Sequence, residues 1–176
     1  MEIRHLTYRY GNRVALNDFS CTLQPGICGL LGPNGAGKST LMKLLCDLMP
    51  RDQGEILTSR GTDIRDIRAA YRAQLGYVPQ QQGFYGSMSA YRFLLYMASL
   101  KKIPGKIAKT EIDQLLDLFH LTEDANRRLD TYSGGMKQRI MLSQAFLGNP
   151  RYLILDEPTV GLDPGEQEIL CRYIRK

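Results

Sequence analysis

The sequence lacks the features that would place it outside the ordinary globular class. It has no long run of Ser, Gln, Pro or single-sign charge and no internal repeat, which excludes low-complexity and solenoid proteins. Its four cysteines form no C-x-x-C pair and have no histidine nearby, so a zinc site is not expected. The longest apolar stretch, Phe93 to Leu100, is too short to span a bilayer, and the polar N-terminus predicts no signal peptide.

The composition that is present indicates a soluble domain with a sizeable core. The 176 residues are 43% hydrophobic and 23% charged, with a formal net charge of +5. This mild excess of Lys and Arg is typical of a solvated surface, although it leaves an anionic partner open. Cys28 and Cys46 lie in apolar stretches, which favours buried thiols in a reducing compartment.

The spacing of apolar residues predicts strands that alternate with helices. Period-two alternation in residues 6–10 and 19–23 is typical of half-buried strands. Residues 27–31 form a continuous apolar run, which predicts a strand buried on both faces. An apolar stripe after Lys38 then predicts a helix. Further candidate strands are residues 56–57, 75–78 and 152–156.

The candidate helix starts carry recognisable capping residues. Thr110 is expected to cap a helix whose apolar stripe includes Ile112 and Leu116. Asp163, with Pro164 and Glu166 after it, matches a capping box at the start of a last helix.

A glycine-rich loop lies between the apolar run and the first helix. Gly32, Gly37, Lys38 and Ser39 match G-x-x-x-x-G-K-[ST], a pattern that curls backbone N–H groups around phosphate oxygens at the start of a helix. Lys38 would contact the β- and γ-phosphates, and the Ser39 hydroxyl would ligate magnesium. The candidate ATP-binding residues of this loop are Gly32, Pro33, Asn34, Gly35, Ala36, Gly37, Lys38, Ser39 and Thr40. A glycine-rich turn that precedes a helix by chance is the alternative, and Thr40 could simply be a first-turn helix residue.

Two acidic residues follow the candidate strand at 152–155. Asp156, at the carboxyl end of a core strand, is suited to hold magnesium, and Glu157 is the candidate that polarises an attacking water. The alternative is two acids that merely close a strand.

Ser133, Gly134 and Gly135 open another predicted helix. Taken alone, they fit a serine N-cap with flexible glycines as well as a second anion site at a helix N-terminus.

The segments GPNGAGKST, GYVPQ, YSGGMKQR, LILDEPT and GLD, in this order, resemble the ATP-binding cassette (ABC) family over nearly the whole chain. The resemblance implies an α/β P-loop NTPase core, RecA-like, with an N-terminal antiparallel β region, a helical insertion, and ATP with Mg²⁺ as ligands. Residues 1–80 and 148–176 would form the core and residues 81–147 the helical subdomain.

The resemblance also implies residue roles, in addition to Lys38 and Glu157. Tyr10 resembles the aromatic residue that stacks on adenine, although a core tyrosine on a strand face is the alternative. Gln80 resembles the glutamine that reaches magnesium and the attacking water. Ser133 to Gly135 resemble the signature that clamps the γ-phosphate held by a second subunit, and Asp163 resembles the aspartate that communicates across that dimer.

The function implied is that of the ATP-hydrolysing subunit of a membrane transporter. An exporter-type system is expected, because the YSGGM form is similar to that of exporters whose permease is a separate chain. Its partners would be a transmembrane permease, which residues 81–103 with the aromatics Phe84 and Tyr85 would contact, and a second ATP-binding subunit, on the cytoplasmic face of the membrane. A soluble ABC ATPase that acts on the ribosome or nucleic acid is the alternative, but no basic stripe with interleaved aromatics supports a nucleic-acid partner. A non-hydrolysing regulator is disfavoured by Glu157.

The chain departs from the family pattern in two respects. Tyr132 and Met136 stand where Leu and Gln are commonest in the family. The serine hydroxyl and the backbone N–H groups would make the phosphate contacts, so little loss of these contacts is expected. The switch histidine that the family carries beyond the aspartate at Asp163 has no counterpart, since His5 and His120 lie elsewhere. We therefore expect a fragment that lacks the last core strands and hydrolyses ATP slowly.

Overall fold

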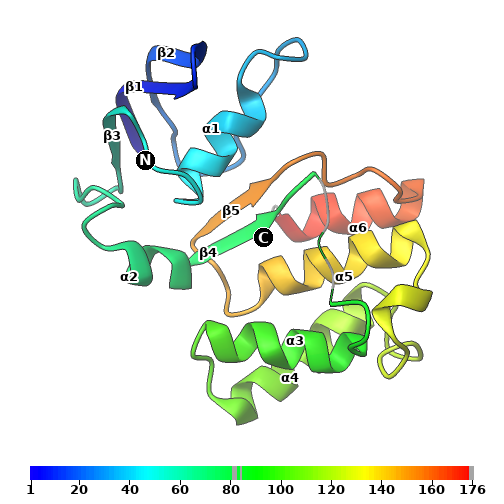
Figure 1. Cartoon of the computed structure of the whole chain (residues 1–176). Coiled ribbons are helices and arrows are strands. Elements are labelled where there is room, and N and C mark those ends of the chain that lie inside the picture. Colours follow the sequence, from blue (N-terminus) through cyan, green and yellow to red (C-terminus); the bar gives the residue numbers. More distant parts are fainter. Residues whose placement is uncertain (81–82, 84, 175–176) are drawn as a thin grey trace. The chain divides into compact units, whose positions relative to one another are not determined.

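The computed structural model describes residues 1–80, 83 and 85–174, and the chain divides into two compact units (Figure 1). The first unit is Met1–Arg72 and the second is Ala73–Ile174. In the part of the chain that the structure describes, none of the helices has the length and hydrophobicity of a membrane span. The predicted division into a core and a helical subdomain at 81–147 remains a proposal.

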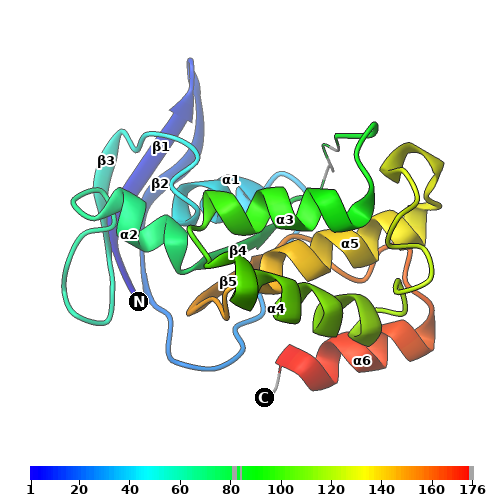
Figure 2. The same ribbon diagram turned by 90° about the horizontal axis from the view of Figure 1, so that it is seen from below.

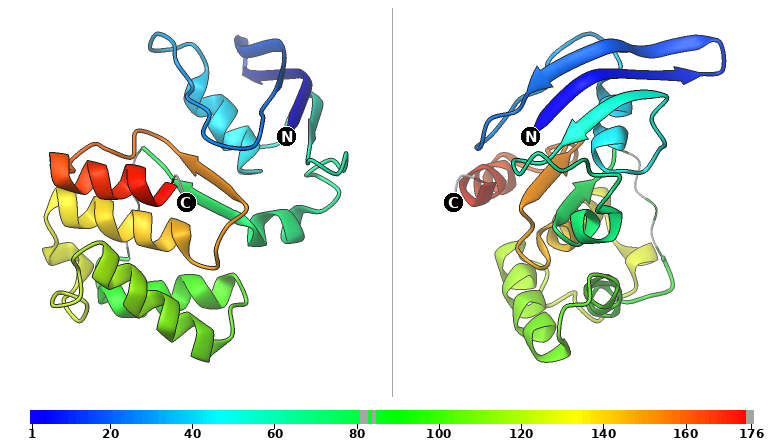
Figure 3. Two further views of the ribbon diagram at one scale, coloured as in Figure 1. Left: turned by 180° about the vertical axis from the view of Figure 1, so that it is seen from behind. Right: turned by 90° about the vertical axis from the view of Figure 1, so that its left-hand side faces the viewer.

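The first unit is built on an antiparallel sheet of order β2–β1–β3. Its elements are β1 (Glu2–Tyr10), β2 (Arg13–Thr22), α1 (Lys38–Leu45), β3 (Gln53–Leu57) and α2 (Arg68–Ala73). The long β1–β2 hairpin, seen well in the right-hand view of Figure 3, has register shifts, and His5 and Asp18 have positive φ angles of 49°. These irregularities interrupt the simple alternation, so that Leu6 is fully buried whereas Tyr10 is exposed.

Residues 27–31 differ from the prediction. They form no strand, and Ile27 and Leu31 are 68% and 95% exposed. An apolar run becomes a strand only where neighbouring strands bond its backbone groups, and none of the strands that the structure describes pairs with residues 27–31. Cys28, within this run, is accordingly exposed, whereas Cys46 is buried as expected.

The second unit contains the parallel strand pair β4–β5 and the remaining helices. Its elements are β4 (Leu75–Val78), α3 (Ala90–Leu100), α4 (Gly105–Leu118), the short 3-10 helix Leu129–Thr131, α5 (Gly134–Phe146), β5 (Tyr152–Leu155) and α6 (Pro164–Ile174). The four α-helices run roughly along one another (Figure 2). Gly76 allows β4 to approach α5 closely, since a Cβ there would lie 2.2 Å from the carbonyl oxygen of Ala145.

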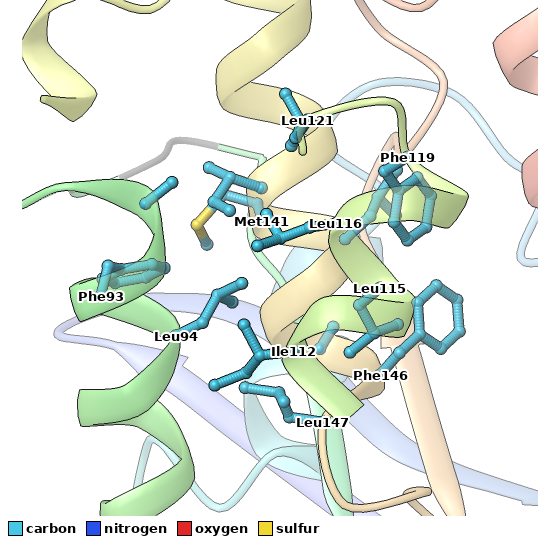
Figure 4. Close-up of a cluster of buried hydrophobic side chains, with 14 of the residues drawn as sticks. Phe93, Leu94, Ile112, Leu115, Leu116, Phe119, Leu121, Met141, Phe146 and Leu147 are labelled. Atoms are coloured by element: carbon cyan, nitrogen blue, oxygen red, sulfur yellow. The ribbon is translucent and has the colours of Figure 1, made fainter. Parts of the chain in front are cut away.

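Helix α5 is at the centre of this unit. It packs against β4, α3 and α4, and nearly every residue from 138 to 147 is buried. Apolar side chains of the three helices point toward one another, among them Leu94 of α3, Ile112 of α4 and Met141 of α5 (Figure 4). Each fully buried side chain of this size contributes about 1.5–3 kcal/mol, so this core fixes α5 firmly.

The helix starts agree with the predicted caps in two cases out of three. Ser133 caps α5, and the box formed by Asp163 and Glu166 caps α6. Thr110 is not a cap, because α4 begins five residues earlier, directly after Pro104. Proline has a φ angle that suits a helix start, which the apolar stripe does not reveal.

Candidate functional site

The loop that precedes α1 has a backbone that only glycine tolerates at several points. Gly35 and Gly37 have φ angles of 83° and 87°, in the left-handed region. A Cβ at Gly37 would lie 2.6 Å from the backbone oxygen of Ala15, so this position has no room for a side chain. The chain then enters α1 at Lys38, whose first-turn N–H groups have no acceptor within the helix.

The Lys38 side chain folds back over this loop. Its ammonium group donates to the backbone oxygens of Gly32, at 2.7 Å, and Pro33, at 2.9 Å. Ser39 is half-buried and Thr40 is 9% exposed. A positive charge, a hydroxyl and the free N–H groups of a helix start are therefore gathered in one short segment, which is a chemical match for a polyanion.

Tyr10, at the end of β1, lies beside the same segment. Its hydroxyl is 3.4 Å from the Thr40 hydroxyl and donates to the Met49 sulfur at 3.6 Å. The ring makes an edge contact with Tyr8, and the side chain remains 46% exposed. The exposed aromatic surface next to the loop is available to a flat ligand group, and its stacking on adenine stays a prediction.

In the second unit, the parallel pair β4–β5 brings its carboxyl ends to one edge. The Asp156 N–H donates to the Val78 oxygen at 2.9 Å, and the Asp156 side chain is buried. Glu157, the next residue, is exposed and has a positive φ of 52°. Gln80 follows β4 on the same edge, so the two strands carry their polar residues to a common place.

Gln80 and Glu157 both line a recess of about 340 Å³. Its lining consists of Gln80, Gly134, Gln138, Glu157, Val160 and Gly161. Three of them were predicted as site residues from the sequence, and they come from three separate segments. Gln138 was not predicted, although a glutamine inside a helix that is otherwise buried is a signal for a specific polar contact.

The start of α5 lies against the loop after Glu157. The Ser133 hydroxyl accepts from the Met136 N–H at 3.2 Å, which is the N-cap contact. A Cβ at Gly135 would lie 2.8 Å from the Gly161 oxygen, so the close approach of loop and helix depends on this glycine. The exposed Gly134 borders the recess.

Asp163 lies at the end of the same loop, where it caps α6. Its carboxylate accepts from the Glu166 N–H at 2.8 Å, and Glu166 accepts in return from the Asp163 N–H at 3.1 Å. Glu166 also forms an ion pair with Arg139 of α5 at 3.0 Å, in which both side chains are largely buried. The Arg139–Glu166 ion pair therefore connects α5 to the start of α6, where the loop after Glu157 ends.

Comparison with known proteins agrees with this geometry. The sequence model of the ABC transporter family matches residues 16–160. The chain belongs to this family. It is 34% identical, over its whole length, to the linearmycin resistance ATP-binding protein LnrL of Bacillus subtilis, and 34% identical to the Nod factor export ATP-binding protein I of Rhizobium johnstonii over 99% of its length. The chain spans 57% and 56% of these two relatives, that is, somewhat more than half of their length.

Solved structures confirm the predicted fold class. An ATP-binding subunit of an ABC transporter superposes with a TM-score of 0.90 at 30% identity, over 99% of this chain and 72% of the other. A second structure, an ABC transporter ATP-binding protein from Pyrococcus furiosus, has a TM-score of 0.80 at 26% identity, over 98% of this chain and 82% of the other. The α/β fold is that of the ABC ATP-binding proteins.

The structure gives a packing reason for Tyr132, one of the two departures from the family pattern noted in the sequence. Tyr132 is 4% exposed, and its hydroxyl donates to the Asp124 backbone oxygen at 2.7 Å. Burial, with a smaller contribution from the Asp124 carboxylate, raises the pKa of Tyr132 to about 12. The neutral ring therefore fills an apolar position with its one polar atom satisfied, while the expectation that this residue costs the phosphate contacts little stays a prediction.

Proposed function

We propose that this chain binds ATP with Mg²⁺ and hydrolyses it as the ATP-binding subunit of an ABC transporter. The observation that carries this proposal is the Lys38 ammonium held over the glycine loop, on the oxygens of Gly32 and Pro33. A triphosphate can replace these two carbonyl contacts with stronger charge-assisted ones. The loop residues Gly32 to Thr40 would bind the phosphates, and Tyr10 would contact the adenine.

The residues available for the metal fit a hard cation. Ser39 supplies a hydroxyl, Asp156 a carboxylate and Gln80 an amide oxygen, which are ligands that Mg²⁺ accepts, directly or through water. Bound Mg²⁺ would neutralise charge on the phosphates. Glu157, exposed at the recess, would polarise the water that attacks the γ-phosphate, with Gln80 beside it.

We further propose that two ATP-binding subunits act together. Ser133, Gly134 and Gly135 at the start of α5 would contact the γ-phosphate of a nucleotide held by the second subunit, since a helix N-terminus favours an anion. Asp163 would contribute to the same interface. Its capping role in the structure is compatible with this, because one carboxylate oxygen already suffices for the cap.

The permease is proposed to contact residues 81–103. Phe84 lies outside the described residues. Tyr85 and Tyr96 are 54% and 37% exposed, and their rings meet edge to face at 5.6 Å. Aromatic pairs of this kind are frequent anchors of protein interfaces. The relatives named for export and for resistance support an exporter-type system on the cytoplasmic side of the membrane.

Affinity purification tests the partner. We expect the tagged protein to co-purify with a polytopic membrane protein, and a Tyr85→Ala, Tyr96→Ala double variant to lose it while ATP binding stays unchanged. Recovery of ribosomes or nucleic acid in its place would support the soluble alternative and contradict the proposal.

The switch histidine leads to a narrower proposal. Neither His5 nor His120 matches its position, so we propose that these 176 residues alone turn over ATP slowly. A version extended through the histidine should hydrolyse ATP faster, and equal rates would refute this point.

A further inference from the structure

The side chain of Gln138 forms a hydrogen bond with Pro158, the residue directly after Glu157. Its side chain is 5% exposed on α5, and its amide nitrogen donates to the Pro158 backbone oxygen at 2.8 Å. Gln138 and Glu157 both line the recess described above. A buried amide therefore holds the peptide directly next to the proposed catalytic carboxylate.

The backbone at this point needs such support. Glu157 has a φ of 52°, a conformation that costs a non-glycine residue about 1 kcal/mol. Pro158 has no N–H to donate, and the backbone bonds described in the turn after it run from Val160 to Glu157 at 3.3 Å and from Leu162 to Thr159 at 3.1 Å. Neither of these bonds involves the Pro158 carbonyl, which accepts instead from the Gln138 amide on α5.

Helix α5 supplies these contacts along its first turns. Gly135 approaches Gly161, Gln138 binds Pro158, and Arg139 pairs with Glu166 beyond the end of the loop. Because α5 is fixed by the core of the second unit, it can hold the loop in one conformation.

We propose that Gln138 is a positioning residue, which sets the direction of the Glu157 carboxylate toward the recess by holding the Pro158 carbonyl. This inference rests on the proposed function, because it assigns Gln138 to the hydrolysis that Glu157 promotes. It does not require Gln138 to touch ATP.

The chain contains a matched control for this residue. Gln144 lies on the same helix, is 6% exposed, and donates its amide to the Tyr77 backbone oxygen at 2.7 Å. It thus has the same side chain, burial and type of bond, but it holds strand β4 and not the loop after Glu157. A purely structural role predicts equal consequences for the two glutamines.

The experiment compares Gln138→Met and Gln144→Met, which keep the shape and remove the donor. We expect both to lower the midpoint of thermal unfolding by similar amounts, since each removes one side-chain hydrogen bond to a backbone oxygen. Only Gln138→Met should lower kcat for ATP hydrolysis, about tenfold or more, with KM for ATP changed less than about twofold. A kcat within about twofold of wild type, or equal losses in both variants, would overturn the inference.

Hydrogen exchange of residues 157–163 separates this inference from the proposed function. Exchange there should be faster in Gln138→Met than in Gln144→Met, whether or not the protein hydrolyses ATP, and equal exchange overturns the inference. Absence of turnover in the wild type contradicts the proposed function instead. If Gln138→Met does not fold, Gln138→Asn, which keeps the amide but shortens its reach, should give the same loss of kcat and the same faster exchange.

Discussion

Gly37 lies at the end of the glycine-rich loop, directly before α1, and two independent features exclude a side chain at this position. Its φ of 87° disfavours any side chain, and the space for a Cβ is taken by the Ala15 backbone oxygen. The motif pattern predicts a glycine here, but only the contact with β2 shows why the position is also limited in volume. The conformation of the loop therefore depends on the strand that packs beside it.

Replacement of Gly37 by alanine should destabilise the protein more than an equivalent change elsewhere. Gly61→Ala is the control, since Gly61 has a similar φ of 75° but nothing within 4 Å of its Cβ position. We expect the control to lose about 1 kcal/mol from backbone strain alone. Gly37→Ala should lose clearly more, measured by chemical denaturation, and equal losses would contradict the packing at Ala15.

Glu157 is the residue whose chemistry is most specific. It is exposed beside the recess and is held at a strained φ, a combination that occurs where function constrains the backbone. Neighbouring Asp156 is buried, and under the proposed function it would hold the metal while Glu157 polarises the water.

Glu157→Gln should leave ATP affinity within about twofold and lower kcat at least a hundredfold, because the amide cannot accept a proton from water. Steady-state turnover and equilibrium binding measure the two effects separately. Glu168→Gln, on the exposed ion pair with Arg172, should leave both unchanged. Normal hydrolysis by Glu157→Gln would show that another group is the base.

The start of α6 shows how a helix cap and the proposed dimer contact share one residue. Asp163 and Glu166 exchange two backbone-to-side-chain bonds, and Glu166 extends the connection to Arg139. The capping box was predictable because both partners are local in sequence. The bond to Arg139 was not predictable, because it joins separate elements.

Asp163→Ala should lower the free energy of unfolding by about 0.5–2 kcal/mol through loss of the cap. Asp163→Asn keeps an oxygen for the Glu166 N–H and should remain within about 0.5 kcal/mol of wild type. Thermal denaturation of the two variants distinguishes them. Equal stability of the alanine and asparagine variants would show that the cap contributes nothing.

The strand β3 is flanked by a buried ion pair between Arg51 and Asp63, at 2.5 Å. Burial raises the pKa of Asp63, but hydrogen bonds from Arg51 and from the Arg65 N–H outweigh it and hold the pKa below its ordinary value. The charged pair then stabilises the fold above the unfolded-state pKa of about 4, and this stability is lost as pH falls through the lowered pKa of the folded state.

Asp63→Asn should therefore be less stable at neutral pH and should lose less additional stability on acidification below about pH 4. Urea denaturation between neutral pH and about pH 3 measures both effects. Asp66→Asn, exposed in the same loop, should keep the acid dependence of the wild type. An unchanged acid slope in Asp63→Asn would contradict the role of the ion pair.

For the whole molecule, elements that depend on local pattern were predictable and those that depend on distant partners were not. The parallel pair β4–β5 and the starts of α1, α5 and α6 follow the apolar spacing and the caps. Residues 27–31 were wrongly predicted as a buried strand, because an apolar run does not specify its neighbours. Thr110 was wrongly predicted as a cap, because Pro104 starts the helix earlier.

The candidate site shows the same division. The motif residues Gln80, Gly134 and Glu157 were found from sequence, and the structure brings them to one recess. Gln138 was not found, because its partner is a backbone oxygen twenty positions away. The roles of the motif residues remain predictions until nucleotide binding and turnover are measured.

Isothermal titration calorimetry with Mg²⁺ and ATP tests the central claim most directly. The folded wild-type protein should bind ATP with measurable heat, Lys38→Ala should lose at least tenfold in affinity, and Lys43→Ala, exposed on the same helix, should bind like the wild type. No heat from a well-folded wild-type sample, or wild-type affinity in Lys38→Ala, would contradict the assignment of the loop as a nucleotide-binding site.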